Sequence, residues 1–186
     1  MNLIILSGGL GTRLHSISNG LPKALMPVGD AVYLDCLLER MFNYDITHVY
    51  LSLHYKPQLF QDYILQSDYS EKLTAMVEPK PLGTGGAITY VVEKTNISSP
   101  FFAINGDSVS VINFNRMAKE FDNNDFKAMI GISEVENAER YGTVALKHHK
   151  VSAFNEKGIS GVGWINNGHY IFTKEAFTGF SGTFSL

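Results

Sequence analysis

Short apolar runs alternate with segments of helical periodicity over most of the chain. Runs that are apolar or rich in β-branched residues predict buried strands at residues 2–7, 48–53, 73–78, 100–105 and 126–133. Between these runs, apolar positions at helical spacing predict helices at residues 33–43, 57–66, 84–94 and 114–123. Repeated strand–helix–strand units predict an α/β fold, a Rossmann-like and mostly parallel sheet with right-handed crossovers and helices on both faces.

The pattern changes after residue 140. Further strands are predicted at Thr143–Lys147, Val151–Asn155 and Gly163–Phe172, separated by short His-Lys and glycine-rich turns. No linker rich in proline or serine and no internal repeat interrupts the sequence. We therefore predict one domain over residues 1–186, with an α/β part at 1–135 and a β-rich part at 136–186. The β-rich part is expected to lie against the main sheet as the second wall of a crevice.

Polar residues stand at the carboxyl ends of the predicted strands. Ser7 and Glu78 each end a predicted strand, and Asn105-Gly106-Asp107 ends another. In open α/β sheets, ligands bind in the crevice outside the carboxyl ends of the strands. Residues far apart in the sequence are therefore expected to converge on one site.

The end of the first strand carries three glycines, Gly8, Gly9 and Gly11. Without a Cβ, backbone N–H groups can approach a phosphate chain closely, and Arg13 and Lys23 add positive charge. The P-loop and the dinucleotide-binding motif are both excluded, because the spacing of the lysine and of the glycines fits neither. The segment predicts a nucleoside triphosphate site. A tight structural turn is the alternative for the glycines alone, but such a turn has no need of two cations.

Composition narrows the picture further. With 186 residues, 45% hydrophobic and 18% charged, the chain is long enough for one globular domain with a sizeable core. A net charge of −3 gives no sign of nucleic-acid binding, so a phosphate ligand must be held by a local site. The single Cys36 excludes an internal disulfide, and its apolar helical surroundings predict a buried, inert thiol. No apolar run approaches the length of about 18 residues that spans a membrane, so we expect no membrane partner and a cytoplasmic location.

A series of motifs in this sequence resembles one family. After the opening Gly8–Leu14 segment and Pro22-Lys23, the motifs are, in order, Glu78–Ala87, Asn105–Ser108, Arg140–Val144, Phe154–Gly158 and Ile165–Tyr170. Together they resemble the sugar-1-phosphate nucleotidyltransferases. The resemblance implies a nucleotide-diphospho-sugar transferase-like fold with a β-rich sugar-binding part, a nucleoside triphosphate and a sugar 1-phosphate as substrates, and Mg²⁺ as cofactor.

The same resemblance implies roles for individual residues in nucleotidyl transfer. Arg13 would stabilise the leaving pyrophosphate, Lys23 would bridge the phosphates near the reacting centre, and Asp107 would hold Mg²⁺. A capping turn after the strand is the alternative for Asp107. The implied nucleotide site consists of Leu6, Ser7, Gly8, Gly9, Gly11, Thr12, Arg13, Lys23, Glu78, Pro81, Gly83, Thr84 and Gly106.

Glu78 is the residue that would select the base. In related thymidylyl- and uridylyltransferases a glutamine commonly stands at this position. Guanine presents two adjacent donors, N1–H and the N2 amine, which a carboxylate can accept together, so the glutamate favours GTP. UTP stays open, because some uridylyltransferases also carry an acid here, and so does a solvated glutamate without a role in binding.

The sugar phosphate is assigned to later residues, again by resemblance. Glu156 would accept from sugar hydroxyls, Lys157 would hold the 1-phosphate, Asn166 would contact another hydroxyl and the Gly142 backbone would lie against the ring. A polar turn is the alternative for the Glu-Lys pair. Within the family the chain most resembles the D-glycero-α-D-manno-heptose 1-phosphate guanylyltransferases of bacterial surface-polysaccharide pathways. Mannose 1-phosphate guanylyltransferases and N-acetylmuramate 1-phosphate uridylyltransferases remain open, as does a homodimer.

Two departures from the family pattern matter. Ala24 replaces the proline that usually follows Pro-Lys, which should only loosen the loop that carries Lys23. Relatives also continue to an Asp-Ile-Gly-Thr-Pro segment with a second metal carboxylate, whereas this sequence ends at Leu186. Mg²⁺ held only by Asp107 is expected to bind weakly. A nucleotide-binding protein without turnover is therefore the alternative of another class, unless a partner or a longer chain supplies the carboxylate.

Overall fold

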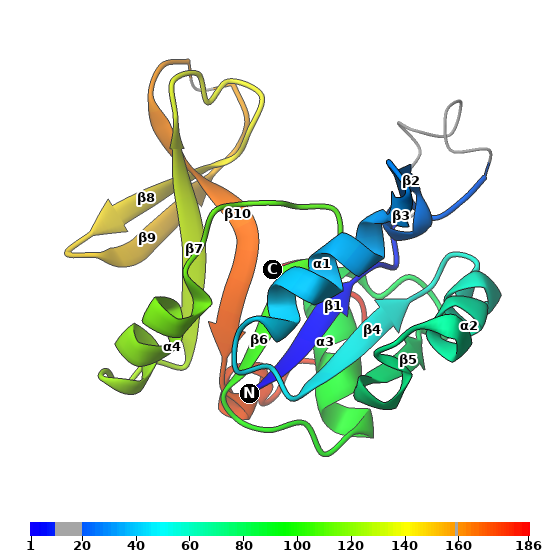
Figure 1. The fold of residues 1–186 in the computed structure, drawn as a ribbon. Coiled ribbons are helices and arrows are strands. Elements are labelled where there is room, and N and C mark those ends of the chain that lie inside the picture. Colours follow the sequence, from blue (N-terminus) through cyan, green and yellow to red (C-terminus); the bar gives the residue numbers. More distant parts are fainter. Residues whose placement is uncertain (10–19, 159) are drawn as a thin grey trace.

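A mixed sheet of eight strands organises the part of the chain that the computed structural model describes, residues 1–9, 20–158 and 160–186 (Figure 1). The strands of the sheet are β1 (Asn2–Leu6), β4 (His48–Leu53), β5 (Leu73–Val77), β6 (Phe101–Asn105), β7 (Ala128–Val135), β8 (Thr143–Lys147), β9 (Lys150–Asn155) and β10 (Gly163–Phe172). Their spatial order is β5-β4-β1-β6-β10-β8-β9, and β7 pairs with β10. A small hairpin of β2 (Pro27–Val28) and β3 (Ala31–Val32), which the sequence did not predict, lies outside this sheet.

The parallel half of the sheet, β5-β4-β1-β6, carries the core. Leu3, Ile4 and Ile5 of β1 have no exposed surface, because helices cover both faces of the strand. Leu3 and Ile5 face one buried cluster and Ile4 faces another. This arrangement confirms the predicted α/β fold with a mostly parallel sheet, and it explains why the strand sequence is apolar without alternation.

The helices divide between the two faces. They are α1 (Tyr33–Phe42), α2 (Pro57–Gln66), α3 (Gly83–Lys94) and α4 (Phe114–Asp122), with short 3₁₀ turns η2 (Lys23–Leu25), η3 (Ser70–Lys72) and η4 (Lys174–Phe177). Side chains of α1, α2 and α4 belong to the same buried cluster as Leu3 and Ile5, whereas those of α3 and η4 belong to the cluster of Ile4. Figure 1 shows α1 in front of the sheet and α3 behind it. No helix in the described residues is long and apolar enough to cross a membrane.

The prediction that the Cys36 thiol is buried is wrong. Cys36 lies on α1 as expected, but its side chain is exposed. The buried face of α1 consists of Leu34, Leu37, Leu38 and Met41, which repeat at intervals of three and four residues. Cys36 falls outside that stripe, so the thiol faces solvent although its sequence neighbours are apolar.

The strands after residue 140 continue the main sheet. β10 pairs antiparallel with β6, placing His169 opposite Ile104, and β8 and β9 extend the sheet beyond β10. The β-rich region, which was expected to lie against the main sheet, is thus part of that sheet and joins it at the edge of β6. Pairing with the free edge of β6 satisfies backbone groups that an edge strand would otherwise expose. β7, predicted as a buried strand in the parallel set, pairs antiparallel with β10 and is mostly half-buried.

Candidate functional site

A pocket of about 410 Å³ opens at the carboxyl ends of the parallel strands. The residue that follows each of the four parallel strands contributes to its wall, namely Ser7, His54, Glu78 and Gly106. Its full lining is Leu6, Ser7, Gly8, Gly9, Lys23, Ala24, His54, Glu78, Pro81, Leu82, Gly83, Thr84, Ala87, Asn105, Gly106 and Asp107. The rule that places ligands at the carboxyl ends of parallel strands thus locates this site correctly.

The ends of β1 and β6 approach one another closely at the floor of the pocket. The Gly106 N–H donates to the Leu6 carbonyl oxygen (2.9 Å), and a Cβ on Gly106 would stand 2.4 Å from Ser7 Oγ. Only glycine fits such a contact without moving the neighbouring strand. Ser7 Oγ is itself buried and has no hydrogen-bond partner among the described residues.

Gly8 and Gly9 differ in their surroundings. A Cβ on Gly8 would stand 3.0 Å from Glu78 Oε1, whereas a Cβ on Gly9 would meet nothing within 4 Å among the described residues. Gly8 therefore lets the end of β1 pass beside the carboxylate, and Gly9 borders open space. Gly11, Thr12 and Arg13, which complete the predicted phosphate cradle, lie outside the described residues.

Glu78 forms one end of the pocket and is only 6% exposed. The hydroxyl of Ser52 donates to its Oε1 (2.9 Å), and the backbone N–H of Leu82 donates to its Oε2 (3.0 Å). A carboxylate has about four acceptor positions, so each oxygen keeps capacity for a further donor. Glu78 is thus held rigidly by the protein while still lining the pocket, and the reading of Glu78 as a solvated residue finds no support.

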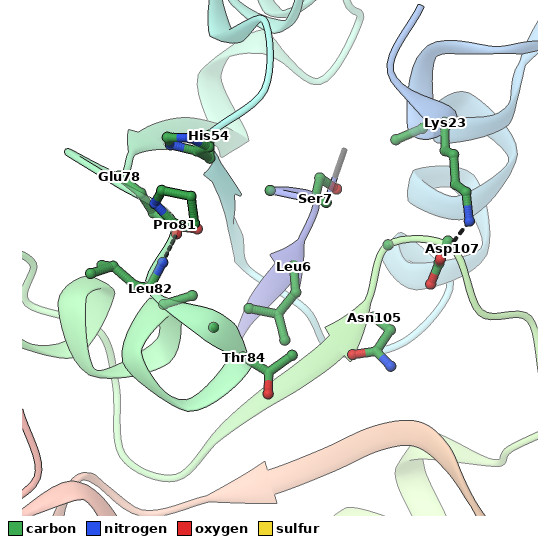
Figure 2. A pocket seen from close by; sticks show the side chains of 16 residues that line it. Leu6, Ser7, Lys23, His54, Glu78, Pro81, Leu82, Thr84, Asn105 and Asp107 are labelled. Carbon is green, nitrogen blue, oxygen red and sulfur yellow. Dashed lines mark hydrogen bonds and ion pairs between the residues drawn. The ribbon is translucent and has the colours of Figure 1, made fainter. Parts of the chain in front are cut away.

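Lys23 and Asp107 form the opposite end of the pocket (Figure 2). Lys23 Nζ lies 3.0 Å from Asp107 Oδ2, and the two side chains are 32% and 51% exposed. Ala24, next to Lys23 in η2, is buried in the core and anchors the turn. Burial raises the pKa of the Tyr33 phenol, and the negative charge of Asp107 raises it further, so Tyr33 stays neutral beside this pair.

The loop after Asp107 is held from the side of α1. Arg40 donates to the Ser110 carbonyl oxygen, and the Tyr44 hydroxyl donates to the Ile112 carbonyl oxygen (3.2 Å). Both donors belong to the segment of α1 and the turn that follows it. The loop that begins at Asp107 is therefore fixed by hydrogen bonds to its residues Ser110 and Ile112.

The same loop is also held by β10. Nδ1 of the buried His169 lies 3.1 Å from Ser110 Oγ and 2.9 Å from the Asn167 carbonyl oxygen. Burial lowers the pKa of His169, although the Asn167 carbonyl opposes this effect. His169 is therefore a neutral, hydrogen-bonded core histidine.

The donor set around Asp107 fits a cation that is shared with a ligand. No cluster of three or more His, Cys, Asp or Glu side chains that could hold a metal occurs in the described part of the chain. Mg²⁺ commonly takes one or two protein carboxylates and completes its shell with substrate phosphates and water. A single half-exposed carboxylate at the pocket edge is compatible with that arrangement.

The residues assigned to the sugar phosphate lie apart from this pocket lining. Glu156 and Lys157 are exposed beyond the end of β9, and Gly142 precedes β8. Asn166 of β10 donates from Nδ2 to the Tyr170 hydroxyl (2.7 Å) and accepts at Oδ1 from the Gly168 N–H (2.8 Å). Their roles remain predictions.

Sequence reasoning did not assign several lining residues. His54, Leu82 and Ala87 were given no role, although Leu82 and Ala87 lie in the recognised motif Glu78–Ala87, and Asn105 was expected near the site but was not assigned to binding. Figure 2 shows His54 on the same side of the pocket as Glu78 and Pro81, opposite Lys23 and Asp107. His54 Nδ1 is buried without a hydrogen-bond partner among the described residues. Its place directly after β4 was the signal that could have found it.

Comparison with known proteins identifies the family of this chain. The sequence matches the family described as "Nucleotidyl transferase" over residues 2–182. It is 32% identical to D-glycero-alpha-D-manno-heptose 1-phosphate guanylyltransferase of Campylobacter jejuni over 97% of this chain and 80% of that protein. The protein of the same name from Aneurinibacillus thermoaerophilus is 33% identical over 95% of this chain and 76% of its own. Mannose-1-phosphate guanyltransferases also match.

A solved structure extends the likeness to three dimensions. HddC from Yersinia pseudotuberculosis, crystallised in complex with GMP-PN, superposes with a TM-score of 0.84 at 32% identity. The match covers 99% of this chain and 82% of that one. The family match covers residues 2–182, and the two guanylyltransferases and this structure are 32–33% identical to the chain. The chain therefore belongs to the nucleotidyl transferase family, as a sugar-1-phosphate nucleotidyltransferase.

Proposed function

We propose that the protein transfers GMP from GTP to a sugar 1-phosphate, with D-glycero-α-D-manno-heptose 1-phosphate as the preferred acceptor. The products are a GDP-sugar and pyrophosphate. One observation carries the proposal: a single pocket has a rigid carboxylate, Glu78, at one end and the Lys23–Asp107 pair at the other. The names of the relatives support the nucleotide and the sugar, and mannose 1-phosphate is the second candidate acceptor.

The base is proposed to bind at the Glu78 end. The carboxylate is fixed by Ser52 and Leu82, so its remaining lone pairs are presented in one orientation. Guanine N1–H and its N2 amine can donate to a carboxylate together. A carboxylate that is positioned before the ligand arrives binds it at a lower entropic cost.

The triphosphate is proposed to run from there toward Lys23. The backbone at Gly8 and Gly9 borders the open part of the pocket, and Lys23 supplies positive charge at its far end. An oxygen of the sugar 1-phosphate attacks the α-phosphorus, the new P–O bond forms, and the bond to the bridging oxygen breaks. Pyrophosphate leaves with the electron pair. Lys23 is proposed to bridge the phosphates near the reacting centre, and Arg13, which lies outside the described residues, to stabilise the charge on the leaving pyrophosphate.

Asp107 is proposed to hold Mg²⁺ together with phosphate oxygens. When bound, Mg²⁺ supplies charge neutralisation across the phosphates. Lys23 neutralises Asp107 in the ligand-free protein and can turn from the carboxylate to a phosphate oxygen when nucleotide enters. The sugar-binding roles of the β-rich part, residues 136–186, and of Gly142, Glu156, Lys157 and Asn166 belong to the same proposal.

The direct test is a panel of sugar 1-phosphates with GTP and with UTP, in the presence of Mg²⁺, with pyrophosphate release as the signal. We expect the highest kcat/KM for GTP with the heptose 1-phosphate. A preference for mannose 1-phosphate would move the assignment to the second acceptor, and a preference for UTP would contradict the role of Glu78. No pyrophosphate from any pair would contradict catalysis by this chain.

Glu78→Gln is expected to weaken GTP binding about 10- to 100-fold, which corresponds to one lost hydrogen bond to a charged group. The glutamine can still accept from the Leu82 N–H, and the Ser52 hydroxyl can rotate to accept from its amide, so the fold should be retained. UTP binding should change much less. Isothermal titration calorimetry with both nucleotides measures the two affinities.

The matched control is Glu93→Gln, the same change at an exposed position of α3. It should leave both affinities unchanged. Equal weakening of GTP and UTP by Glu78→Gln would show that the carboxylate maintains the pocket without reading the base.

A further inference from the structure

The segment Gly182–Leu186 lies on the first turn of α3. The carbonyl oxygen of Phe184 accepts from the N–H groups of both Gly85 and Gly86 (3.1 Å each). In the reverse direction, the Phe184 N–H donates to the Leu82 carbonyl oxygen (3.0 Å). The first N–H groups of a helix have no partner within the helix and often bind phosphate. Here the Phe184 carbonyl oxygen accepts from one such group, that of Gly85, and from the next N–H of the helix, that of Gly86.

The glycines at the start of α3 are required by this contact. A Cβ on Gly85 would stand 2.2 Å from the Phe184 ring, and a Cβ on Gly86 would stand 2.4 Å from the Gly182 carbonyl oxygen. A Cβ on Gly83 would stand 2.5 Å from the Phe184 carbonyl oxygen. Real Cβ atoms do not approach other atoms this closely, because interiors are already close-packed. Gly83 was assigned to nucleotide binding, but the nearest atoms to added Cβ atoms on Gly83, Gly85 and Gly86 belong to the segment Gly182–Leu186.

Leu82 links this segment to the base end of the pocket. Its carbonyl oxygen accepts from Phe184, and its N–H donates to Glu78 Oε2. Thr84, which lines the pocket, accepts at Oγ1 from the Leu186 N–H (2.9 Å). A displacement of the segment would therefore also shift Leu82, which donates to Glu78, and Thr84, which lines the pocket.

Phe184 is the anchor of the segment. It is the half-buried residue between exposed neighbours on either side, and its ring packs against the core cluster on the α3 face of the sheet. The ring also stacks on Phe180, with 5.4 Å between the centroids. The other contacts of the segment are backbone hydrogen bonds and hydrogen bonds to hydroxyl groups. Such bonds alone contribute little net stability to an exposed segment.

We propose that Gly182–Leu186 is a positioning segment for the base end of the nucleotide pocket, with Phe184 as the positioning residue. The proposal rests on the proposed function in one respect, since it takes Glu78 as the base-binding end. Docking of the segment fixes the first turn of α3, that turn fixes Leu82, and Leu82 fixes Glu78. Affinity for the base should depend on Phe184, while affinity for phosphate at the Lys23 end should not.

Phe184→Ala tests the proposal by ligand binding. We expect the GTP dissociation constant to rise about 10-fold, in line with the cost of a small misplacement of a binding group, and the preference for GTP over UTP to narrow. The affinity for inorganic pyrophosphate, which lacks a base, should stay the same. Leu65→Ala is the matched control, because Leu65 is an exposed apolar residue of α2, outside the pocket lining. Unchanged GTP affinity and GTP/UTP preference in folded Phe184→Ala would overturn the proposal.

Gly85→Ala provides an independent test through the same contact. The added methyl group meets the Phe184 ring, so this variant should lose GTP affinity as Phe184→Ala does and should have a lower Tm. In the double variant the ring is absent and alanine is the better helix former. Gly85→Ala should then cause no further loss of affinity and no fall in Tm relative to Phe184→Ala alone. Additive losses would overturn the steric link between the two residues.

Amide hydrogen exchange separates this proposal from the proposed function. Exchange at Gly85 and Gly86 should be slow in the wild-type protein and faster in Phe184→Ala, whether or not nucleotide is present. If the wild-type protein does not bind GTP, the proposed function is contradicted. The exchange rates at Gly85 and Gly86 would still show whether the segment Gly182–Leu186 docks on α3. Equal exchange in the two proteins would contradict docking itself. Phe184→Leu, which keeps an apolar anchor, should behave like the wild type.

Discussion

Asp107→Asn should lower kcat/KM for pyrophosphate release by about 10²- to 10³-fold, the usual range for loss of one charged or dipolar group at a reacting centre. Asparagine keeps the shape of the side chain but removes the negative charge that attracts a divalent cation. The ion pair with Lys23 is also lost, but both side chains are partly exposed, so stability should fall by no more than about 1 kcal/mol. Steady-state kinetics over a range of Mg²⁺ concentrations measures the effect.

Asp62→Asn, the same change at an exposed position of α2, is the control and should keep wild-type kinetics. If excess Mg²⁺ restores part of the activity of Asp107→Asn, the carboxylate contributes mainly to cation affinity. If Asp107→Asn is fully active at low Mg²⁺ concentration, Asp107 has no role at the reacting centre, and the capping-turn interpretation of this residue is the correct one.

Lys23→Met should lower kcat by about 10²-fold while leaving the Tm almost unchanged. Methionine keeps an apolar stem of similar length but removes the ammonium group. The same variant should bind Mn²⁺ more tightly in the absence of nucleotide, because Lys23 no longer competes for Asp107 Oδ2. Loss of turnover combined with tighter cation binding would not follow from a general loss of structure.

Single-turnover kinetics and Mn²⁺ titration by electron paramagnetic resonance provide the two measurements. Lys94→Met at the end of α3 is the control, since Lys94 is exposed at the carboxyl-terminal end of that helix. A large fall in Tm without a change in kcat would mean that Lys23 is a structural residue.

Much of the fold could be predicted because its signals are local. The run around Ile4 is apolar at every position, and that pattern occurs where a strand is covered on both sides. Helix bounds followed from the same reasoning, and the prediction of 57–66 coincides with α2. The position of the pocket also followed, because the residue after each parallel strand must lie at one edge of the sheet.

The remainder depends on contacts between distant residues. β10 pairs with β6, and neither strand's own sequence indicates which strand it will pair with. Cys36 is exposed because the buried face of α1 includes the next residue, Leu37, but not Cys36 itself. The apolar residues around Cys36 in the sequence do not show on which side of this boundary it lies. The contact between Leu186 and Thr84 joins residues 102 positions apart.

The side chains around Glu78 show the same limit within the site. The sequence identified the glutamate from its place in a motif, but its orientation depends on Ser52 in a neighbouring strand and on one backbone N–H. Likewise, the sequence did not show that the glycines of α3 lie against the segment Gly182–Leu186. Only the packed structure identified these partners.

The β6–β10 ladder has a consequence for how the two substrates meet. In the described residues, the α/β part and the β-rich part share backbone hydrogen bonds from Phe101–Phe172 to Ile104–His169, next to the strand end that leads to Asp107. Two lobes joined by a linker would need a domain closure before the attacking oxygen could align with the α-phosphorus. If the β-rich part binds the acceptor as proposed, the register of one sheet sets the spacing between the two substrate-binding halves, and the substrates would be aligned by the fold itself.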